Sequence, residues 1–210
     1  MNQKLRAIAS FIDQDDIVLD TCCDHAYLAI YLKKNELCQK VYASDINPNA
    51  LNGAKKNILA SQLDIPTYLS DGFKNIDVKD INTAAIAGVG ANTVIDIIRY
   101  APEHIQKFII SSNNHLGMLR KSLYQKGLYI KKEIAILDKH KYYVIMLVTR
   151  EYVKEDRISL KYGKSNHQDY YLSLLKKEQD VLQQIPKKQI FRQLEHRMNI
   201  QELKRLIKRI

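Results

Sequence analysis

Short apolar runs alternate with longer amphipathic stretches over the first 150 residues, and this alternation limits the possible folds more than any other feature. The apolar runs predict five strands, at Ile17 to Asp20, Lys40 to Ser44, Pro66 to Ser70, Thr83 to Ala87 and Lys107 to Ser111. The stretches between them have helical spacing and predict helices at Leu28 to Lys34, Asn47 to Gln62, Asn92 to Tyr100 and Leu116 to Lys126. Strands joined through helices pair in parallel, so we expect an α/β fold with helices on both faces of the sheet.

Two more apolar runs follow, at Tyr129 to Leu137 and at Tyr142 to Thr149. Only the short polar segment Asp138 to Lys141 separates them. Apolar runs this close together are typical of a hairpin, so we expect an antiparallel pair to close the sheet.

Near residue 151 the chain becomes polar and rich in lysine, with helical spacing and few strand signals. Its apolar residues form two stripes separated by Pro186, the first at Leu172, Leu175 and Leu182 and the second at Ile200, Leu203, Ile207 and Ile210. This pattern predicts a coiled-coil-like helical hairpin whose apolar faces pack together. We therefore divide the chain into a domain of residues 1–150 and a basic helical extension of residues 151–210.

The net charge of +10 at pH 7 comes largely from this extension, which holds 14 Lys or Arg against eight Asp or Glu. A basic surface favours polyanions such as nucleic acids, because neutralised phosphates release their counterions. A lysine-rich face that serves only solubility explains the same composition. Charge alone does not decide between the two.

Neither the apolar run of a signal peptide nor the roughly 20 apolar residues of a membrane span occurs in the sequence. Cys22, Cys23 and Cys38 lack the spacing of a disulfide framework or of a CxxC metal site. We therefore expect a soluble, cytoplasmic protein with reduced thiols.

Polar residues or glycines follow all five predicted strands, and open α/β sheets bind ligands at the carboxyl ends of their strands. These positions are residues 20–28, Asp45, Asp71-Gly72, Gly88-Val89-Gly90 and Asn113-Asn114. Asp45 can bind both hydroxyls of a ribose, and Asp71 can accept a hydrogen bond from an adenine amino group. An aspartate at the end of a strand is also a common helix cap, so this alternative stays open.

The loop after the first strand lacks GxGxxG, and no GxxxxGK[ST] sequence occurs in the chain. These absences disfavour ordinary dinucleotide binding and P-loop phosphate chemistry. A nucleoside cofactor without a pyrophosphate fits the strand ends better, and S-adenosylmethionine is such a cofactor.

Four places in the sequence and the basic tail carry a family likeness. The four places are Asp24-His25-Ala26-Tyr27-Leu28, Asp71-Gly72, Ile86-Ala87-Gly88-Val89-Gly90 and Asn113. Together they resemble the bacterial tRNA (adenine-22 N1)-methyltransferases of the TrmK type, and the likeness runs over nearly the whole chain. The first segment is fairly specific to that family, whereas many class I methyltransferases share the others. The resemblance implies a seven-stranded, Rossmann-like class I methyltransferase sheet with a C-terminal pair of helices. It also implies S-adenosylmethionine-dependent methylation of tRNA at adenine N1 in the D-arm region.

The chain departs from the family pattern at several positions, of which Cys22 matters most physically. Cys22 replaces a glycine where the backbone must approach the cofactor, and a side chain there can crowd it. The other departures are Ala91 for a glycine, Ser111-Ser112 for Gln-Pro, Val144 for a glutamate, Lys164 for a proline and Lys4 for an arginine.

The strand ends and the resemblance together give candidate residues for the cofactor and for catalysis. The cofactor candidates are Asp20, Cys22, His25, Asp45, Asp71, Gly72, Ala87 and Gly88, and the catalytic candidates are Asp24, Tyr27 and Asn113. Tyr27 can stack on an exposed adenine, Asp24 can stabilise the charge that develops on the adenine, and Asn113 can hold its amino group. A helix cap at Asp24 and a turn at Asn113 are comparable explanations.

The candidate RNA-binding residues are Lys4 and the tail cations Lys187, Lys188, Arg192, Arg197, Lys204, Arg205, Lys208 and Arg209. The histidines show no mutual metal-ligand spacing, so we expect no metal. Two alternatives stay open: a methyltransferase for another RNA or a protein, and a non-catalytic RNA-binding relative whose cofactor site has eroded. Whether the protein is a monomer or a homodimer also stays open.

Overall fold

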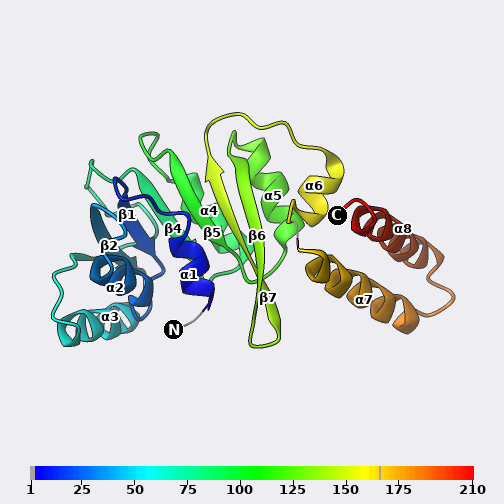
Figure 1. The fold of residues 1–210 in the computed structure, drawn as a ribbon, viewed down its shortest axis with the longest axis horizontal. Helices are drawn as coiled ribbons and strands as arrows, with labels where there is room; N and C mark the ends of the chain where they lie inside the picture. The colour runs from blue at the N-terminus through cyan, green and yellow to red at the C-terminus, as the bar shows by residue number, and fades with distance from the viewer. Residues whose placement is uncertain (1–2, 166) are drawn as a thin grey trace.

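Seven strands form one sheet in the order β3-β2-β1-β4-β5-β7-β6 in the computed structural model, which describes residues 3–165 and 167–210 (Figure 1). The strands are β1 (Ile17–Thr21), β2 (Lys40–Asp45), β3 (Thr67–Leu69), β4 (Thr83–Ala87), β5 (Lys107–Ser111), β6 (Tyr129–Asp138) and β7 (Lys141–Thr149). The first five pair in parallel, and β7 pairs antiparallel with both β5 and β6. The predicted seven-stranded α/β sheet is therefore confirmed.

Helices cover both faces of the sheet, as predicted. They are α1 (Gln3–Ala9), α2 (Tyr27–Lys34), α3 (Pro48–Ala60), α4 (Ala91–Arg99), α5 (Leu116–Gln125), α6 (Arg157–Tyr162), α7 (Gln168–Gln184) and α8 (Ile190–Ile207). Side chains of α1, α2 and α3 pack in one core cluster, and those of α4 and α5 pack in the other. Alternate strand residues serve the two clusters, since Val18 and Ile109 face the first while Leu19 and Phe108 face the second.

The sequence predicts the start of α3 correctly: the side chain of Asn47 accepts a 2.9 Å hydrogen bond from the backbone of Asn49, and Pro48 opens the helix. It does not predict the short helices α1 and α6.

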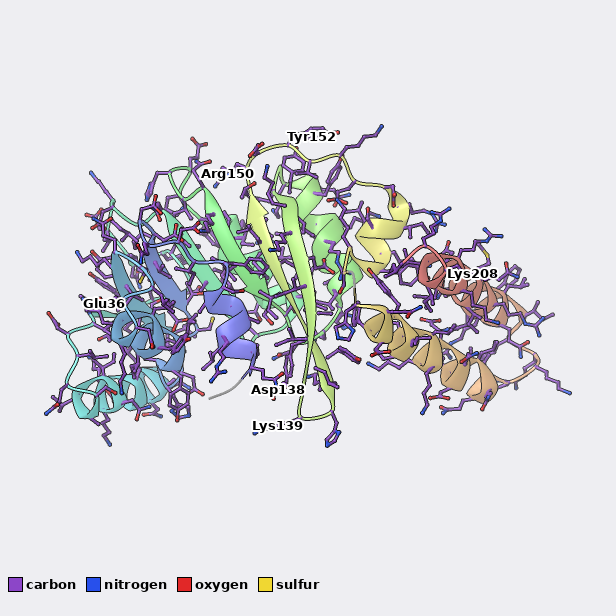
Figure 2. The ribbon with its side chains drawn as sticks, viewed as in Figure 1. Glu36, Asp138, Lys139, Arg150, Tyr152 and Lys208 are labelled. Atoms are coloured by element: carbon purple, nitrogen blue, oxygen red, sulfur yellow. The ribbon has the colours of Figure 1, made fainter. Side chains whose placement is uncertain are left out.

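The hairpin of β6 and β7 extends beyond the carboxyl end of β5. Residues 146–149 of β7 pair with β5, whereas residues 141–145 pair with β6 alone. Lys139 and His140 form the turn with φ of 47° and 64°, the left-handed geometry of a two-residue hairpin loop. Asp138 and Lys139 project below the rest of the sheet in Figure 2.

The tail forms the predicted helical hairpin, with α7 and α8 side by side and Pro186 in their connection. Its apolar stripes are only partly covered. Leu203 is fully buried, but Leu172 and Ile210 remain 44% and 49% exposed. The prediction that both stripes form packing surface is therefore wrong for these two residues.

The tail packs against a buried ion pair that joins α5 to the sheet. The guanidinium of Arg120 on α5 meets the carboxylate of Glu133 on β6 through two hydrogen bonds of 2.8 and 2.9 Å. Gly163, which follows α6, lies against this pair, and the hydroxyl of Tyr171 donates to its carbonyl oxygen at 3.1 Å. The first turn of α7 is thereby held to the domain core.

Candidate active site

The loop between β1 and α2 has an unusual backbone. Cys22, Asp24 and Ala26 all adopt left-handed conformations, with φ of 57°, 44° and 54°. Such a conformation costs a residue with a Cβ atom about 1–2 kcal/mol. Hydrogen bonds hold the loop in place: the backbone N–H of Cys23 donates to Ser44 at 3.0 Å, and that of Asp24 to the Asp45 carboxylate at 3.1 Å.

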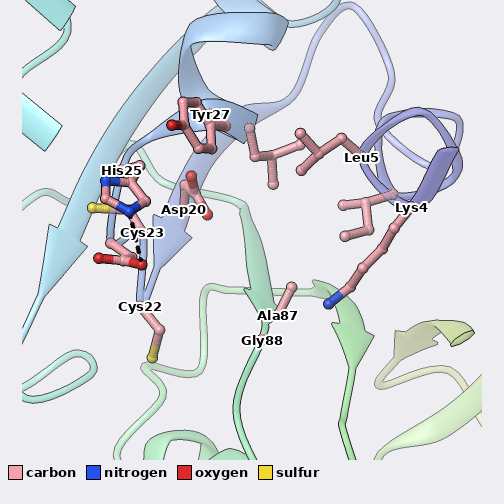
Figure 3. Close-up of a pocket in the computed structure, with 12 residues that line it drawn as sticks. Lys4, Leu5, Asp20, Cys22, Cys23, His25, Tyr27, Ala87 and Gly88 are labelled. Carbon is pink, nitrogen blue, oxygen red and sulfur yellow. Dashed lines mark ion pairs between the residues drawn. The ribbon is translucent and has the colours of Figure 1, made fainter. Parts of the chain in front are cut away.

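This loop walls a cavity of about 200 Å³ together with the ends of β1 and β4 and the first helix, α1. The cavity brings together eight of the residues predicted from the sequence: Lys4, Asp20, Cys22, Asp24, His25, Tyr27, Ala87 and Gly88 (Figure 3). In Figure 3 the side chain of Lys4 extends from α1 toward the end of β4. Lys4 thus lies at the cavity and not with the tail cations.

Three carboxylates act on the side chain of Cys22 from the ends of three neighbouring strands. Burial is the largest cause that raises the pKa of its thiol, and the charges of Asp45, Asp20 and Asp71 act in the same direction, so that the pKa is about 11. The loop therefore lies in a region of negative potential, which favours a cationic ligand.

Asp20 is the most enclosed of these acids, with 4% of its surface exposed. Its Oδ2 accepts a 3.3 Å hydrogen bond from the backbone N–H of Ala29. Burial raises the pKa of this carboxyl to about 7, against the opposing effect of that hydrogen bond, and the charge of Asp45 contributes to the rise. A cation beside Asp20 would favour its ionised form.

Asp45, Asp71 and Gly72 are not among the described residues that line the cavity. Asp45 accepts hydrogen bonds from the backbones of Asp24 and Asn47 at 3.1 and 2.9 Å. Asp71 forms an exposed 2.5 Å ion pair with Lys74. Both carboxylates retain acceptor capacity, because a carboxylate oxygen has two lone-pair sites.

The loops after β4 and β5 are joined through Asn113. Its side-chain amide donates to the carbonyl oxygen of Gly88 at 2.6 Å, and its backbone N–H donates to Val89 at 2.9 Å. Gly88 has a φ of 89°, and a Cβ atom added there would meet no atom within 4 Å. Asn113 thus links two loops, and the Oδ1 atom of its side chain remains available as an acceptor.

Asp24, His25 and Tyr27 lie at the mouth of the cavity. The Asp24 Oδ2 is 3.4 Å from the His25 Nε2, and the His25 and Tyr27 rings lie 5.3 Å apart. Asp24 does not cap α2, whose N-cap is the left-handed Ala26 without a side-chain hydrogen bond. The helix-cap alternative for Asp24 is therefore wrong. Tyr27 is 57% exposed, so its ring can meet a ligand that comes from solvent.

All eight candidate cations of the tail are exposed, and Lys208 lies at the end of α8 in Figure 2. Phe191 lies between Lys188 and Arg192 and is 89% exposed. We did not single out this aromatic from the sequence, although its position among cations was readable there.

Lys141 and Tyr143 at the start of β7 were also missed. The Lys4 Nζ and the Lys141 Nζ lie 5.1 and 5.2 Å from the centroid of the Tyr143 ring. Their position near the cavity depends on the pairing register of the hairpin, which the sequence does not reveal.

Within residues 3–165 and 167–210, no group of three or more His, Cys, Asp or Glu is placed to hold a metal ion. None of the helices described is long and apolar enough to cross a membrane.

Comparison with known proteins gives a consistent result. The family described as a methyltransferase domain matches residues 1–146. The Mycoplasma genitalium protein MG248, whose name assigns it provisionally as a tRNA methyltransferase, is 30% identical over 154 residues, which are 71% of this chain and 70% of that protein. The tRNA (adenine(22)-N(1))-methyltransferase of Bacillus subtilis is 24% identical over 152 residues, 70% of this chain and 64% of its own length.

A solved structure shows the same architecture over the whole chain. It is TrmK of M. capricolum in complex with S-adenosyl-homocysteine, 27% identical, with a TM-score of 0.86. The similarity covers 99% of this chain and 98% of that one, so it includes the helical tail.

Proposed function

This chain belongs to the methyltransferase family, and on that premise we propose that it transfers the methyl group of S-adenosylmethionine to tRNA, at N1 of an adenine in the D-arm region. The observation that carries the proposal is the position of Asp20, Asp45 and Asp71 at the carboxyl ends of the neighbouring strands β1, β2 and β3, next to the loop that Asp45 holds by a hydrogen bond from the Asp24 backbone. S-adenosylmethionine carries a sulfonium and an ammonium, so these carboxylates complement its positive charges.

The residues present fit this cofactor. Asp20 offers a buried carboxylate to a cation in the cavity, and the open space at Gly88 leaves the backbone accessible to a ligand. Asp45 ends β2 and Asp71 follows β3, where a ribose and an adenine would find acceptors. Cys22 carries a side chain in a left-handed conformation that glycine would adopt without strain, so the loop keeps the backbone shape of a glycine site.

When bound, S-adenosylmethionine supplies an electrophilic methyl group, which the lone pair of adenine N1 attacks while the carbon–sulfur electron pair stays on sulfur. Because neutral adenine already carries that lone pair, no strong general base is needed, and positioning is the main task of the protein. Asn113 donates to Gly88 through its amide nitrogen and presents Oδ1 as the acceptor for the adenine amino group. Tyr27 stacks on the exposed base, and Asp24 stabilises the positive charge that the methylated ring acquires.

We further propose that residues 1–150 perform the transfer and residues 151–210 bind the RNA. The exposure of all eight tail cations supports this division, since phosphates reach exposed ammonium and guanidinium groups without displacing other contacts. Lys4, at the cavity, would contact RNA close to the reacting base.

Methyl transfer to unmodified tRNA tests the proposal directly. The protein is incubated with radiolabelled S-adenosylmethionine and tRNA transcripts, and the nucleosides of the product are analysed. We expect the product tRNA to contain 1-methyladenosine. The Asp24→Ala variant should form at least tenfold less of it. Calorimetry that detects no S-adenosylmethionine binding to folded protein would contradict any methyltransferase function and favour the non-catalytic alternative. Transfer to other RNA or to protein, with none to tRNA, would contradict the proposed acceptor.

A further inference from the structure

A second cavity, of about 410 Å³, lies next to the first, between the end of the sheet and the tail. Its walls come from the turn after β5, the start of β7, and the helices α6, α7 and α8. A volume of this size is typical of sites that enclose a small organic group such as a nucleotide. Of its lining residues, Asn113 alone has a role in the proposed function.

The two cavities meet at two points. Asn113 lines the second cavity and donates to Gly88, which lines the first. Tyr143 also lines the second cavity. The side chain of Lys4, which lines the first cavity, approaches the Tyr143 ring. A strand of RNA in the second cavity can therefore place one of its bases at the cofactor.

The overhang of β7 creates this arrangement. Residues 141–145 extend past the end of β5, so Lys141 and Tyr143 stand beyond the carboxyl edge of the sheet, where the predicted site residues gather. Both side chains of this pair line the second cavity. A hairpin that ended level with β5 would leave the cavity without this wall.

The chemistry of the cavity suits a nucleotide. Tyr142 and Tyr143 supply aromatic rings, and the half-buried Tyr142 is held edge-on against Tyr170 at 5.7 Å and His167 at 5.5 Å. Lys141 and Lys177 supply exposed cations. Aromatic rings beside ammonium groups bind single-stranded nucleic acid, because rings stack on bases and cations neutralise phosphates.

The two lysines beside Tyr143 favour the binding of an anion between them. Burial lowers the pKa of Lys4, and the charge of Lys141 lowers it further, so the two ammonium groups repel each other. A phosphate beside both of them would reverse this effect.

We propose that this second cavity is the acceptor cleft, in which Tyr143 packs against the nucleotide next to the target adenine while Lys141 and Lys4 bind the phosphate between them. The proposal rests on the proposed function and names the part of the surface through which the RNA strand reaches the cofactor. Tyr143 and Lys141 are positioning residues, since neither touches the reacting atoms.

Three variants test the cleft: Lys141→Ala, Tyr143→Ala and Tyr143→Phe. Lys56→Ala is the control. Lys56 is an exposed lysine on α3, which lies far from α7 at the other end of the molecule in Figure 1. Affinity for tRNA is measured by filter binding between 50 and 300 mM salt, roughly the range over which phosphate contacts dominate. Calorimetry with S-adenosylmethionine is run on every variant.

We expect Lys141→Ala to weaken tRNA binding several-fold and to reduce the slope of log affinity against log salt by about 1, the contribution of one phosphate contact. Tyr143→Ala should lower kcat/KM for tRNA about tenfold, as the loss of one base stack does, and Tyr143→Phe should restore it. Affinity for S-adenosylmethionine should stay within about twofold of the parent in all variants, which also verifies folding.

Equal behaviour of Lys141→Ala and Lys56→Ala in affinity and salt slope would overturn the inference, as would a Tyr143→Phe variant as impaired as Tyr143→Ala. Failure of the proposed function looks different, because the unaltered protein would then fail to methylate tRNA. Methylation of tRNA by the parent with no effect of the cleft variants would therefore exclude the cleft alone.

Discussion

The side-chain amide of Asn113 donates a 2.6 Å hydrogen bond to the carbonyl oxygen of Gly88, and this bond fixes the loop after β5 against the loop after β4. It also orients the Asn113 side chain, whose Oδ1 is left as an acceptor for a substrate. The two cavities adjoin at this bond.

Asn113→Ala should therefore lower kcat about tenfold, because one lost hydrogen bond is worth about 0.5–1.5 kcal/mol and the acceptor for the adenine is lost with it. Asn114→Ala is the control. Its side chain accepts from the backbone N–H of Ala91 at 3.1 Å, at the start of α4, and has no assigned contact with the base. Steady-state kinetics should show a larger loss of kcat for Asn113→Ala, and equal losses would remove its assigned role.

Cys22→Gly should stabilise the protein. Replacing a residue with φ of 57° by glycine removes about 1 kcal/mol of backbone strain, which corresponds to a rise in Tm of about 2–4 °C in a chain of this size. Cys22→Ala keeps the Cβ atom and should give no rise. Thermal unfolding of the three proteins checks this, and a Cys22→Ala variant as stable as Cys22→Gly would show that backbone strain is not the cause.

S-adenosylmethionine should bind more tightly as the pH rises through 7. Because burial raises the pKa of Asp20 to about 7, the carboxyl is largely protonated at pH 6 and ionised at pH 8, and only the ionised form attracts a cation. Affinity should be roughly tenfold lower at pH 6 than at pH 8. Calorimetry across this range measures it, with Asp20→Asn as the comparison: that variant should bind weakly and show a flat pH profile.

Gly163→Ala should disrupt the attachment of the tail. A Cβ atom there would lie 1.9 Å from the Glu133 Oε1 and 2.6 Å from the Arg120 guanidinium, so the buried pair would have to separate. Breaking such a pair costs about 3–5 kcal/mol. Gly127→Ala is the matched control. Gly127 has a φ of 72°, but no atom lies within 4 Å of an added Cβ, so this substitution should lower the free energy of unfolding by only about 1 kcal/mol. Similar urea midpoints for the two variants would contradict this account of the attachment.

Charge reversal at the tip of the tail should weaken RNA binding without affecting the cofactor. A Lys187→Glu/Lys188→Glu/Arg192→Glu variant should lose at least tenfold in tRNA affinity and reduce the salt slope by about 2–3, if each cation meets one phosphate. The control variant replaces three exposed lysines of α2 and α3 by glutamate, namely Lys34, Lys55 and Lys56. Filter binding that shows equal losses in the two variants would mean that net charge, and not the tail, governs affinity.

Much of the fold was predictable because its elements have strong local signals. Two strands have the predicted bounds, Thr83 to Ala87 and Lys107 to Ser111, because polar turns bound their apolar residues. The seven-residue α1 was not predicted, because its burial depends on Ile8 and Ala9 packing against elements distant in the sequence.

The cavity was predictable in part, from the residues at the ends of β1 and β4. Asp20, Cys22 and Gly88 reach one cavity because β1 and β4 are neighbours in the sheet. Tyr143 and Lys141 were not predictable in the same way. Their position results from the pairing of β7 with β5 over residues 146–149 only, and β5 and β7 are separated by α5 and β6, so no turn between them indicates that register in the sequence.

The burial of Cys22 and its negative surroundings also affect the reactivity of its thiol. A thiol must ionise before it attacks an alkylating reagent or is oxidised, and a pKa of about 11 leaves only a minute fraction of Cys22 as thiolate near neutral pH. Burial, together with the carboxylates that favour a cationic cofactor, thus keeps this cysteine almost entirely in its less reactive thiol form. Oxidative damage, to which an exposed active-site cysteine is ordinarily subject, should spare the cofactor loop of this protein.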